Sequence, residues 1–317
     1  MDLIKRFKDI DRRSPGVTVA THDGKFHLDD VMSSALLKLA SELAGVKLSI
    51  VRTRDPRIIA KAHVVIDVGE EYRPQDLIFD HHQIRDESDE PECAFSLLFR
   101  ETGLSILGSY FERIGKHEDV AFHVYKRMLG TIVRSIARID NNVRIHHGDL
   151  PNLSYMIGGL NTVREPSQLN MTDKEVRAAN FDKAVLIAYH TLLVCMQNLL
   201  VQHEDLAYIQ AEINSQKKGP TPEVLILKRP TDAWKGIVKS CAWIRVVACQ
   251  SKSKQWLLHH KLDGSDIKVK MPQEWLDNPN HLNTILDTKG VLPISSFQIQ
   301  CTNDNKERVI KLLLEQS

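Results

Sequence analysis

The sequence has few cysteines, and they follow no recognised pattern. Five occur in 317 residues, an odd number, and no two form a Cys-x-x-Cys pair. The spacing therefore indicates neither a disulfide framework nor a cysteine zinc site, and a reducing compartment is expected. Excess charge is also lacking. The formal net charge is +1, so affinity for a polyanion or an anionic membrane must come from a local patch.

Long uninterrupted apolar runs are absent as well. The longest apolar stretch, residues 184–201, contains His190, Gln197 and Asn198, so it predicts a buried helix in preference to a membrane span. The opening residues, MDLIKRFKDIDRR, lack the apolar centre of a secretory signal, and their three aspartates argue against a mitochondrial presequence. We expect an intracellular protein with no membrane partner, and the sequence does not choose between cytoplasm, nucleus and mitochondrion.

Strand-like and helix-like segments alternate in the first half of the chain. Short β-branched runs occur at residues 17–21, 47–53, 62–69 and 77–82, and the clearest helical pattern covers residues 27–45. This alternation predicts an α/β fold with a mainly parallel sheet and helices on its faces.

The second half of the chain has a different character. Residues 171–216 carry no strand signal and predict one long helix or two broken ones, with a capping box at Thr172 and Glu175. A segment with the composition of a linker, KKGPTPE, follows at 217–223, and short strand-like runs come after it, with a closing helix. We predict three parts: an N-terminal α/β domain over residues 12–165, a helical connector over 166–216 and a smaller α+β C-terminal domain over 217–317.

Acidic residues and histidines gather where the predicted strands end. Three successive strand ends, at residues 21–22, 66–67 and 79–82, meet at one edge of a parallel sheet, where ligands bind in such folds. Together they offer His22, His27, Asp29, Asp30, Asp67, Asp80, His81 and His82. So many carboxylates pack together favourably only if cations neutralise them. Histidine and aspartate ligands without sulfur suit Mn²⁺, Mg²⁺, Fe²⁺ or Zn²⁺, and one carboxylate can bridge two such ions.

Four short segments of the chain resemble the motifs of a known family. THDGKFHLDD, VIDVGEEY, FDHHQ and, further on, ARIDNN resemble motifs of the MYG1 (UPF0160-type) proteins, a branch of the DHH phosphoesterases. The resemblance covers nearly all of the chain and is weakest after the linker. It implies a DHH-like N-terminal domain, a substrate-binding C-terminal domain, two divalent cations with Mn²⁺ foremost, and 3′→5′ exonuclease activity on RNA.

The resemblance also implies roles for individual residues. The metal ligands would be His22, His27, Asp29, Asp67, His81 and Asp140, with Asp67 in the bridging position. The catalytic residues would be His82, facing the phosphate or assisting the second ion, and Asp80, which orients a histidine through a hydrogen bond. For Asp30 we prefer stabilisation of the first helical turn. Arg52 and Arg54, in RTRDPR, are candidates to hold a neighbouring phosphate.

Three positions depart from the family pattern. Ala137 stands where an acidic residue is expected, Asn142 replaces a glycine, and residues 295–306 lack the Gly-Gly-His motif thought to hold substrate phosphate. Three functions therefore stay open. The first is a metal-dependent phosphodiesterase, an exoribonuclease with RNA as substrate. The second is a weak or inactive paralogue that binds RNA or proteins as a scaffold. The third is a hydrolase of small phosphate esters. The oligomeric state is left open.

Two further histidine pairs have simpler interpretations. His146 and His147 are expected in an exposed loop, and His259 and His260 are expected as adjacent strand residues that face opposite sides.

Overall fold

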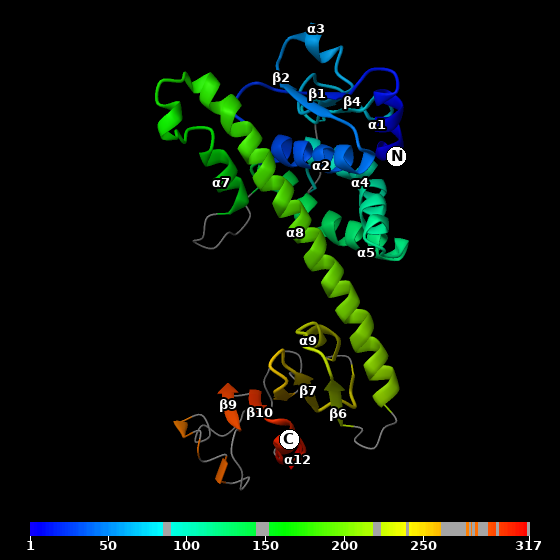
Figure 1. Cartoon of the computed structure of the whole chain (residues 1–317), viewed down its shortest axis with the longest axis vertical. Coiled ribbons are helices and arrows are strands. Elements are labelled where there is room, and N and C mark those ends of the chain that lie inside the picture. Colours follow the sequence, from blue (N-terminus) through cyan, green and yellow to red (C-terminus); the bar gives the residue numbers. More distant parts are fainter. Residues whose placement is uncertain are drawn as a thin grey trace. The chain divides into compact units, whose positions relative to one another are not determined.

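The structure is a computed structural model of the whole chain. It describes residues 1–84, 90–143, 152–217, 223–238, 241–260, 277–278, 280, 283–284, 291–295 and 298–315. The chain divides into two compact units, residues 1–200 and 201–317, and one long helix contributes residues to both (Figure 1). The domain boundaries predicted at residues 165 and 216 stay predictions.

The N-terminal unit contains a five-stranded sheet in the order β2-β1-β3-β5-β4. Strand β1 (Val17–Thr21) runs parallel to β2 (Leu48–Arg52) and to β3 (Val64–Ile66), and β3 runs parallel to β5 (Ile78–Phe79). The edge strand β4 (Tyr72–Arg73) is antiparallel to β5. The predicted mainly parallel sheet is confirmed. Strand β4 was not predicted, because two residues in a polar segment carry no periodic signal.

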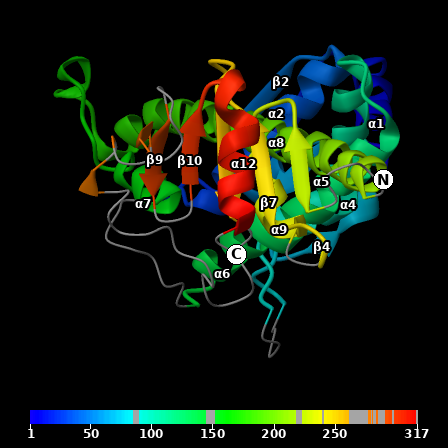
Figure 2. The ribbon, with the colours of Figure 1, turned by 90° about the horizontal axis from the view of Figure 1, so that it is seen from below.

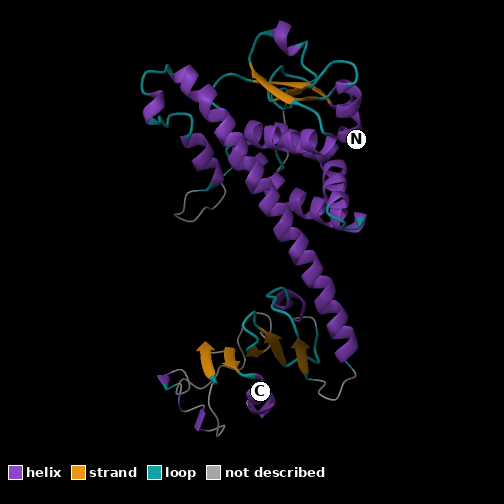
Figure 3. Cartoon of the chain, in the orientation of Figure 1, coloured by secondary structure: helices purple, strands orange, loops and turns teal. Residues whose placement is uncertain are grey.

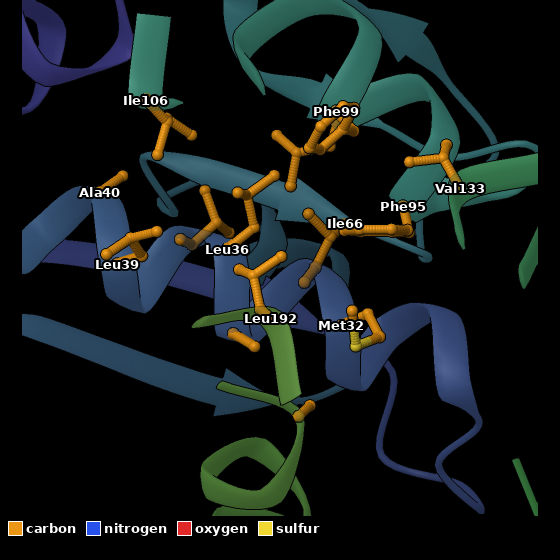
Figure 4. Packing of buried hydrophobic residues seen from close by; sticks show 14 of the residues in the cluster. Met32, Leu36, Leu39, Ala40, Ile66, Phe95, Phe99, Ile106, Val133 and Leu192 are labelled. Carbon is orange, nitrogen blue, oxygen red and sulfur yellow. The ribbon is translucent and has the colours of Figure 1, made fainter. Parts of the chain in front are cut away.

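Helices cover one face of this sheet. Helices α1 (Leu3–Asp11), α2 (Leu28–Ala44) and α4 (Ala94–Arg113) form the main hydrophobic core with the strands. Figure 4 shows Ile66 of β3 directed at side chains of α2 and α4, among them Leu36 and Phe95. Because side chains alternate along a strand, Val65, which precedes Ile66 in β3, is directed to the other face.

The opposite face has a much lighter cover. Helix α3 (Pro56–Ile59) is a single turn, and it lies on the side of the sheet away from α2 (Figure 1). Val65 of β3 and Ile78 of β5 face this side, where they line a cavity together with Ile59. The metal-ligand candidates at the strand ends therefore lie beside a sheet face that is only partly filled.

The helical segment over residues 118–140 contains a local irregularity. Helix α5 (Glu118–Met128) continues into a π-helical turn, η2 (Leu129–Val133), and then into α6 (Arg134–Asp140). A π turn shifts the rotational phase of the residues after it and is frequent near functional sites. Helix α7 (Leu153–Gly159) and the 3₁₀ turn η3 (Pro166–Gln168) lead to the long helix.

Helix α8 (Asp173–Gln216) is one continuous helix of 44 residues, which resolves the choice left open by the sequence. At its start, Thr172 and Glu175 form the expected capping box, in which Thr172 N donates to Glu175 Oε2 at 2.8 Å. By length and composition α8 is the one helix among the described residues that could cross a membrane, with an 18-residue window of mean hydropathy 1.8. A single such helix is weak support for a membrane span, because core helices of soluble proteins pass the same test.

The C-terminal unit contains a mixed five-stranded sheet in the order β6-β7-β8-β10-β9, separate from the first sheet (Figure 3). Strands β6 (Val224–Leu227) and β7 (Val246–Gln250) are parallel. Strands β8 (Trp256–His260), β10 (Gln298–Cys301) and β9 (Leu292–Ser295) continue the sheet with antiparallel pairings. The predicted smaller α+β part is confirmed, and one of the strand-like runs after the linker, at residues 266–272, lies outside the described residues.

Both faces of the second sheet are packed. Helix α12 (Lys306–Glu315) lies against β7 and β8 (Figure 2) and contributes Val309, Ile310 and Leu313 to one core. Ile209 and Ile213, from the end of α8, pack on the other face with short helix α9 (Trp234–Ile237). The last turns of α8 thus belong to the core of this unit.

Candidate metal centre

The predicted strand ends meet because β1, β3 and β5 are adjacent and parallel. His22 follows β1, Asp67 follows β3, and Asp80 to His82 follow β5. Asp67 has a φ of 54°, in the left-handed region. A non-glycine residue there costs on the order of 1–3 kcal/mol and persists only where the surrounding structure enforces it, and such residues cluster at functional sites. The strained backbone turns the Asp67 carboxylate into the group of histidines around it.

Asp67 lies at the centre of the site. Its Oδ2 is 3.2 Å from Nε2 of His22, and its Oδ1 is 3.6 Å from Nε2 of His81. Nε2 of His81 is also 3.3 Å from Oδ2 of Asp140, the last residue of α6. Segments far apart in the sequence are therefore joined through one carboxylate.

The ligand atoms form three groups, in each of which all atoms lie within 4.8 Å of one another, and two of these groups share Asp67. The groups are His22, Asp30 and Asp67; His27, Asp29 and Asp140; and Asp67, Asp80, His81 and His82. All six residues predicted as metal ligands are among them. Asp67 is shared by two groups, as a bridging carboxylate would be.

Several polar atoms of the cluster are buried and have no hydrogen-bond partner among the described residues. Asp29 and Asp30 are 0% exposed, and Asp67 is 4% exposed. No hydrogen-bond donor among the described residues reaches either oxygen of Asp29, and Nδ1 of His22 has no hydrogen-bond partner there. A buried carboxylate without a partner is unfavourable by several kcal/mol. The donor set, mixed aspartate and histidine without sulfur, fits divalent cations such as Mn²⁺, Mg²⁺, Fe²⁺ or Zn²⁺.

The pKa values reflect this crowding. Burial raises the pKa of Asp29 well above its usual range, and Asp67 and Asp140 raise it further. Burial also raises the pKa of Asp30, to about 7. Burial acts in the same direction on Asp67, but the neighbouring imidazoles of His22 and His81 outweigh it and hold the pKa of Asp67 below its usual range. Burial and crowding therefore disfavour the charged forms of Asp29 and Asp30, which a bound cation would stabilise.

Asp80 organises the loop that carries the histidines. Its Oδ1 accepts from the backbone N–H of His81 at 2.7 Å and of His82 at 3.1 Å, and it lies 2.6 Å from Nδ1 of His82. Its Oδ2 accepts from the backbone N–H of Glu70 at 2.8 Å. Asp80 thereby fixes the His82 ring and ties the end of β5 to the loop after β3.

Asp30 has a larger part than the sequence indicated. Its Oδ1 accepts from the backbone N–H of His27 at 2.8 Å, which is the helix-start role that we preferred. Its Oδ2, however, lies 3.4 Å from Nε2 of His22 and belongs to a metal-ligand group. One signal could have identified it, because a cap uses a single carboxylate oxygen and leaves the other for the site.

The two candidate phosphate-binding arginines differ in their surroundings. Arg52 donates to the carbonyl of Gly24 at 2.6 Å, and its guanidinium lies 4.7 Å from the ring centre of Phe181 and 5.4 Å from that of Phe26. These contacts hold the loop between His22 and His27. Arg54 has a side chain 66% exposed, 3.6 Å from Asp23. The phosphate-binding roles of both stay predictions, and Arg54 is the better placed.

Two cavities adjoin the cluster. One, of about 830 Å³, is lined by the metal-ligand candidates His22, His27, Asp67, His81 and Asp140 together with Lys25 and Ser154. The other, of about 700 Å³, lies against β3, β5 and α3. Arg54, Asp67 and His82 line both cavities, so a substrate at the cluster has access to two spaces.

Of the two further histidine pairs, only His259 and His260 fall among the described residues. His146 and His147 lie outside the described residues. His259 is 5% exposed, and its ring centre is 4.8 Å from that of Trp234. Burial lowers the pKa of His259 to about 4, so it is a neutral core residue of the C-terminal unit.

A family profile described as an uncharacterised protein family, UPF0160, and labelled for MYG1 exonucleases, matches residues 18–310. This chain belongs to the MYG1 (UPF0160) family. The resemblance seen in the four motifs is therefore confirmed over nearly the whole chain.

Individual MYG1 relatives match shorter stretches. The MYG1 protein of Dictyostelium discoideum is 28% identical over 182 residues, covering 53% of this chain and 53% of that protein. The MYG1 exonuclease of Mus musculus is 32% identical over 136 residues, covering 39% of this chain and 35% of that protein. These matches thus span about half the length of the first relative and about a third of the second.

Solved structures resemble the chain only loosely. The exonuclease RecJ bound to manganese gives a TM-score of 0.28 at 13% identity, covering 99% of this chain and 94% of that one. CDC45 from Entamoeba histolytica gives a TM-score of 0.29 at 9% identity, covering 98% and 97%. These superpositions are too loose to assign a role to any residue.

Proposed function

We propose that this protein is a metal-dependent phosphodiesterase that shortens RNA from the 3′ end and uses two divalent cations, Mn²⁺ foremost. The observation that carries the proposal is the Asp67 carboxylate, which has one oxygen beside His22 and the other beside His81 in a buried group of uncompensated acids. Membership of the MYG1 family and the exonuclease names of its relatives support the hydrolase class.

The residues that would hold the cations follow from the three groups. His22 and Asp67 belong to one group and His27, Asp29 and Asp140 to another, with His81 close to both Asp67 and Asp140. Asp30 would add a carboxylate oxygen beside His22. When bound, paired cations lower the pKa of a shared water and neutralise charge that develops on the phosphoryl oxygens.

The chain's own residues then bind and orient the phosphate. His82, whose side chain is 57% exposed, is fixed through Nδ1 by Asp80. Its Nε2 is the ring nitrogen that can contact a non-bridging phosphate oxygen. Arg54 lines both cavities and supplies a guanidinium for a neighbouring phosphate. Asp80 acts through His82 and the loop after β3, as a positioning residue.

A binding-only paralogue is the second candidate, and one feature of the C-terminal unit favours it. The segment expected to hold substrate phosphate runs from β10 through the 3₁₀ turn η5 (Asn303–Asn305) directly into α12. Residues 298–306 contain neither glycine nor histidine. Substrate contacts from this unit would therefore differ from the family pattern.

One assay separates the candidates. Wild type and Asp67→Asn are incubated with Mn²⁺ and single-stranded RNA labelled at its 5′ end, with Asp9→Asn in helix α1 as a matched control. A ladder of shortened RNA in wild type and control, but not in Asp67→Asn, supports the proposal. Tight RNA binding without shortening supports the scaffold. Hydrolysis of small phosphate esters while RNA stays intact supports the third function. Release of the 5′ label as a single nucleotide would show that digestion starts at the 5′ end instead of the 3′ end.

A further inference from the structure

The cavity of about 700 Å³ has a lining that differs from the metal cluster beside it. Its apolar surface comes from the lightly covered sheet face and from α3, and consists of Pro56, Ile59, Val65, Val68 and Ile78. Parallel sheets are normally buried on both faces. A planar apolar group would complete the cover at this position.

The rim of the same cavity is acidic. Glu70, Glu71 and Asp76 line it, and Arg73 is 2.7 Å from Glu71 and 3.4 Å from Asp76. Arg73 and Arg54, which also lines the cavity, neutralise part of this charge. Asp67 and Asp80 belong to the lining as well, so it retains an excess of carboxylates. Such a rim suits hydroxyl groups, which donate hydrogen bonds to carboxylates, and disfavours phosphates.

The loop that forms this rim has a defined backbone. Asp67, Gly69 and Glu70 all have positive φ, at 54°, 100° and 55°. The backbone N–H of Glu70 donates to Asp80, which also holds His82. The cavity wall and the metal cluster are thus built on the same few residues, and the wall is preorganised relative to the cluster.

We propose that this cavity binds the terminal nucleoside of the substrate, with its base on the apolar surface and its sugar hydroxyls toward Glu70. A phosphodiester at the cluster has two ester substituents, which must leave in two directions. The cavity of about 830 Å³ carries Lys25 at its lining, beside Arg54, which both cavities share, and suits the phosphate-bearing remainder of the chain. The acidic cavity suits the uncharged end. This inference rests on the phosphodiesterase function proposed above.

The test fills the cavity with an indole. Ala60, which is exposed, and Ala62, which is half-buried, both line it, and Ala60→Trp and Ala62→Trp give two independent variants. Ala178→Trp, at an exposed position of α8, is the matched control. Binding of AMP is measured by calorimetry with Mn²⁺ present. Turnover is measured on RNA and on methyl p-nitrophenyl phosphate, whose retained methyl group needs no such cavity.

We expect both cavity variants to weaken AMP binding about tenfold or more, and to lose about tenfold more kcat/KM on RNA than on the methyl ester. The control should match wild type. Unchanged AMP binding, or equal losses on both substrates, would overturn the inference. If wild type hydrolyses neither substrate, the proposed function fails. In that case the nucleoside-binding role of the cavity is still supported if wild type binds AMP and the two tryptophan variants do not.

Discussion

The carboxylate of Asp67 and the imidazole of His22 lie 3.2 Å apart, although 45 residues separate them in the chain and each follows a different strand. The opposite oxygen of Asp67 lies beside His81. This relationship makes Asp67 the residue on which the site depends, since it joins groups that otherwise share no ligand.

Asp67→Asn should remove Mn²⁺-dependent stabilisation without unfolding the protein. Asparagine tolerates the left-handed backbone and removes one negative charge from a crowded cluster. Ligands stabilise the state that they bind, so Mn²⁺ should raise the melting temperature of wild type and have little effect on the variant. Thermal denaturation with and without Mn²⁺ measures this. An equal rise in both proteins would show that the cations bind elsewhere.

Two substitutions of Asp30 should distinguish its hydrogen bond at the helix start from its charge beside His22. Asp30→Asn retains an oxygen that can accept from His27 N–H, whereas Asp30→Ala loses the cap as well as the charge beside His22. Both variants should lose RNA hydrolysis, but only alanine should lower the free energy of unfolding, by about 0.5–2 kcal/mol. Full activity in Asp30→Asn would restrict this residue to the helix start.

Arg52→Ala should mainly lower stability, whereas Arg54→Ala should mainly raise KM for RNA. Loss of Arg52 removes the hydrogen bond to Gly24 and the stacking on Phe26 and Phe181, and should lower stability by about 1–3 kcal/mol. Loss of the exposed Arg54 should leave stability unchanged and raise KM for RNA. Urea denaturation followed by circular dichroism, together with steady-state kinetics, compares them. A raised KM in Arg52→Ala at unchanged stability would contradict the assigned contacts.

His259 should make the C-terminal unit sensitive to acid. Burial lowers its pKa from 6.5 to about 4. The folded state therefore excludes a proton that the unfolded state binds, so stability should fall as pH decreases from about 6.5 to about 4, by about 3 kcal/mol in all. His259→Phe should abolish this dependence of stability on pH. All four tryptophans lie within residues 201–317, so tryptophan fluorescence follows this unit, and identical pH profiles in both proteins would exclude the effect.

Much of the site could be predicted because it depends on strand ends. The alternation of strands and helices predicted a parallel sheet, and in such a sheet His22, Asp67 and His81 must share an edge. The part that was missed depends on individual side-chain contacts. The second oxygen of Asp30 and the contacts of the Arg52 guanidinium with two aromatic rings have no periodic signal. Strand β4 and the cavity under α3 follow from tertiary packing for the same reason.

The most direct test is anomalous diffraction from crystals grown with Mn²⁺. We expect two peaks about 3.5–4 Å apart, one on each side of the Asp67 carboxylate, with His22 contacting one ion and His81 the other. The absence of any peak among these residues, or a single ion that leaves Asp67 uncoordinated, would contradict the two-cation centre.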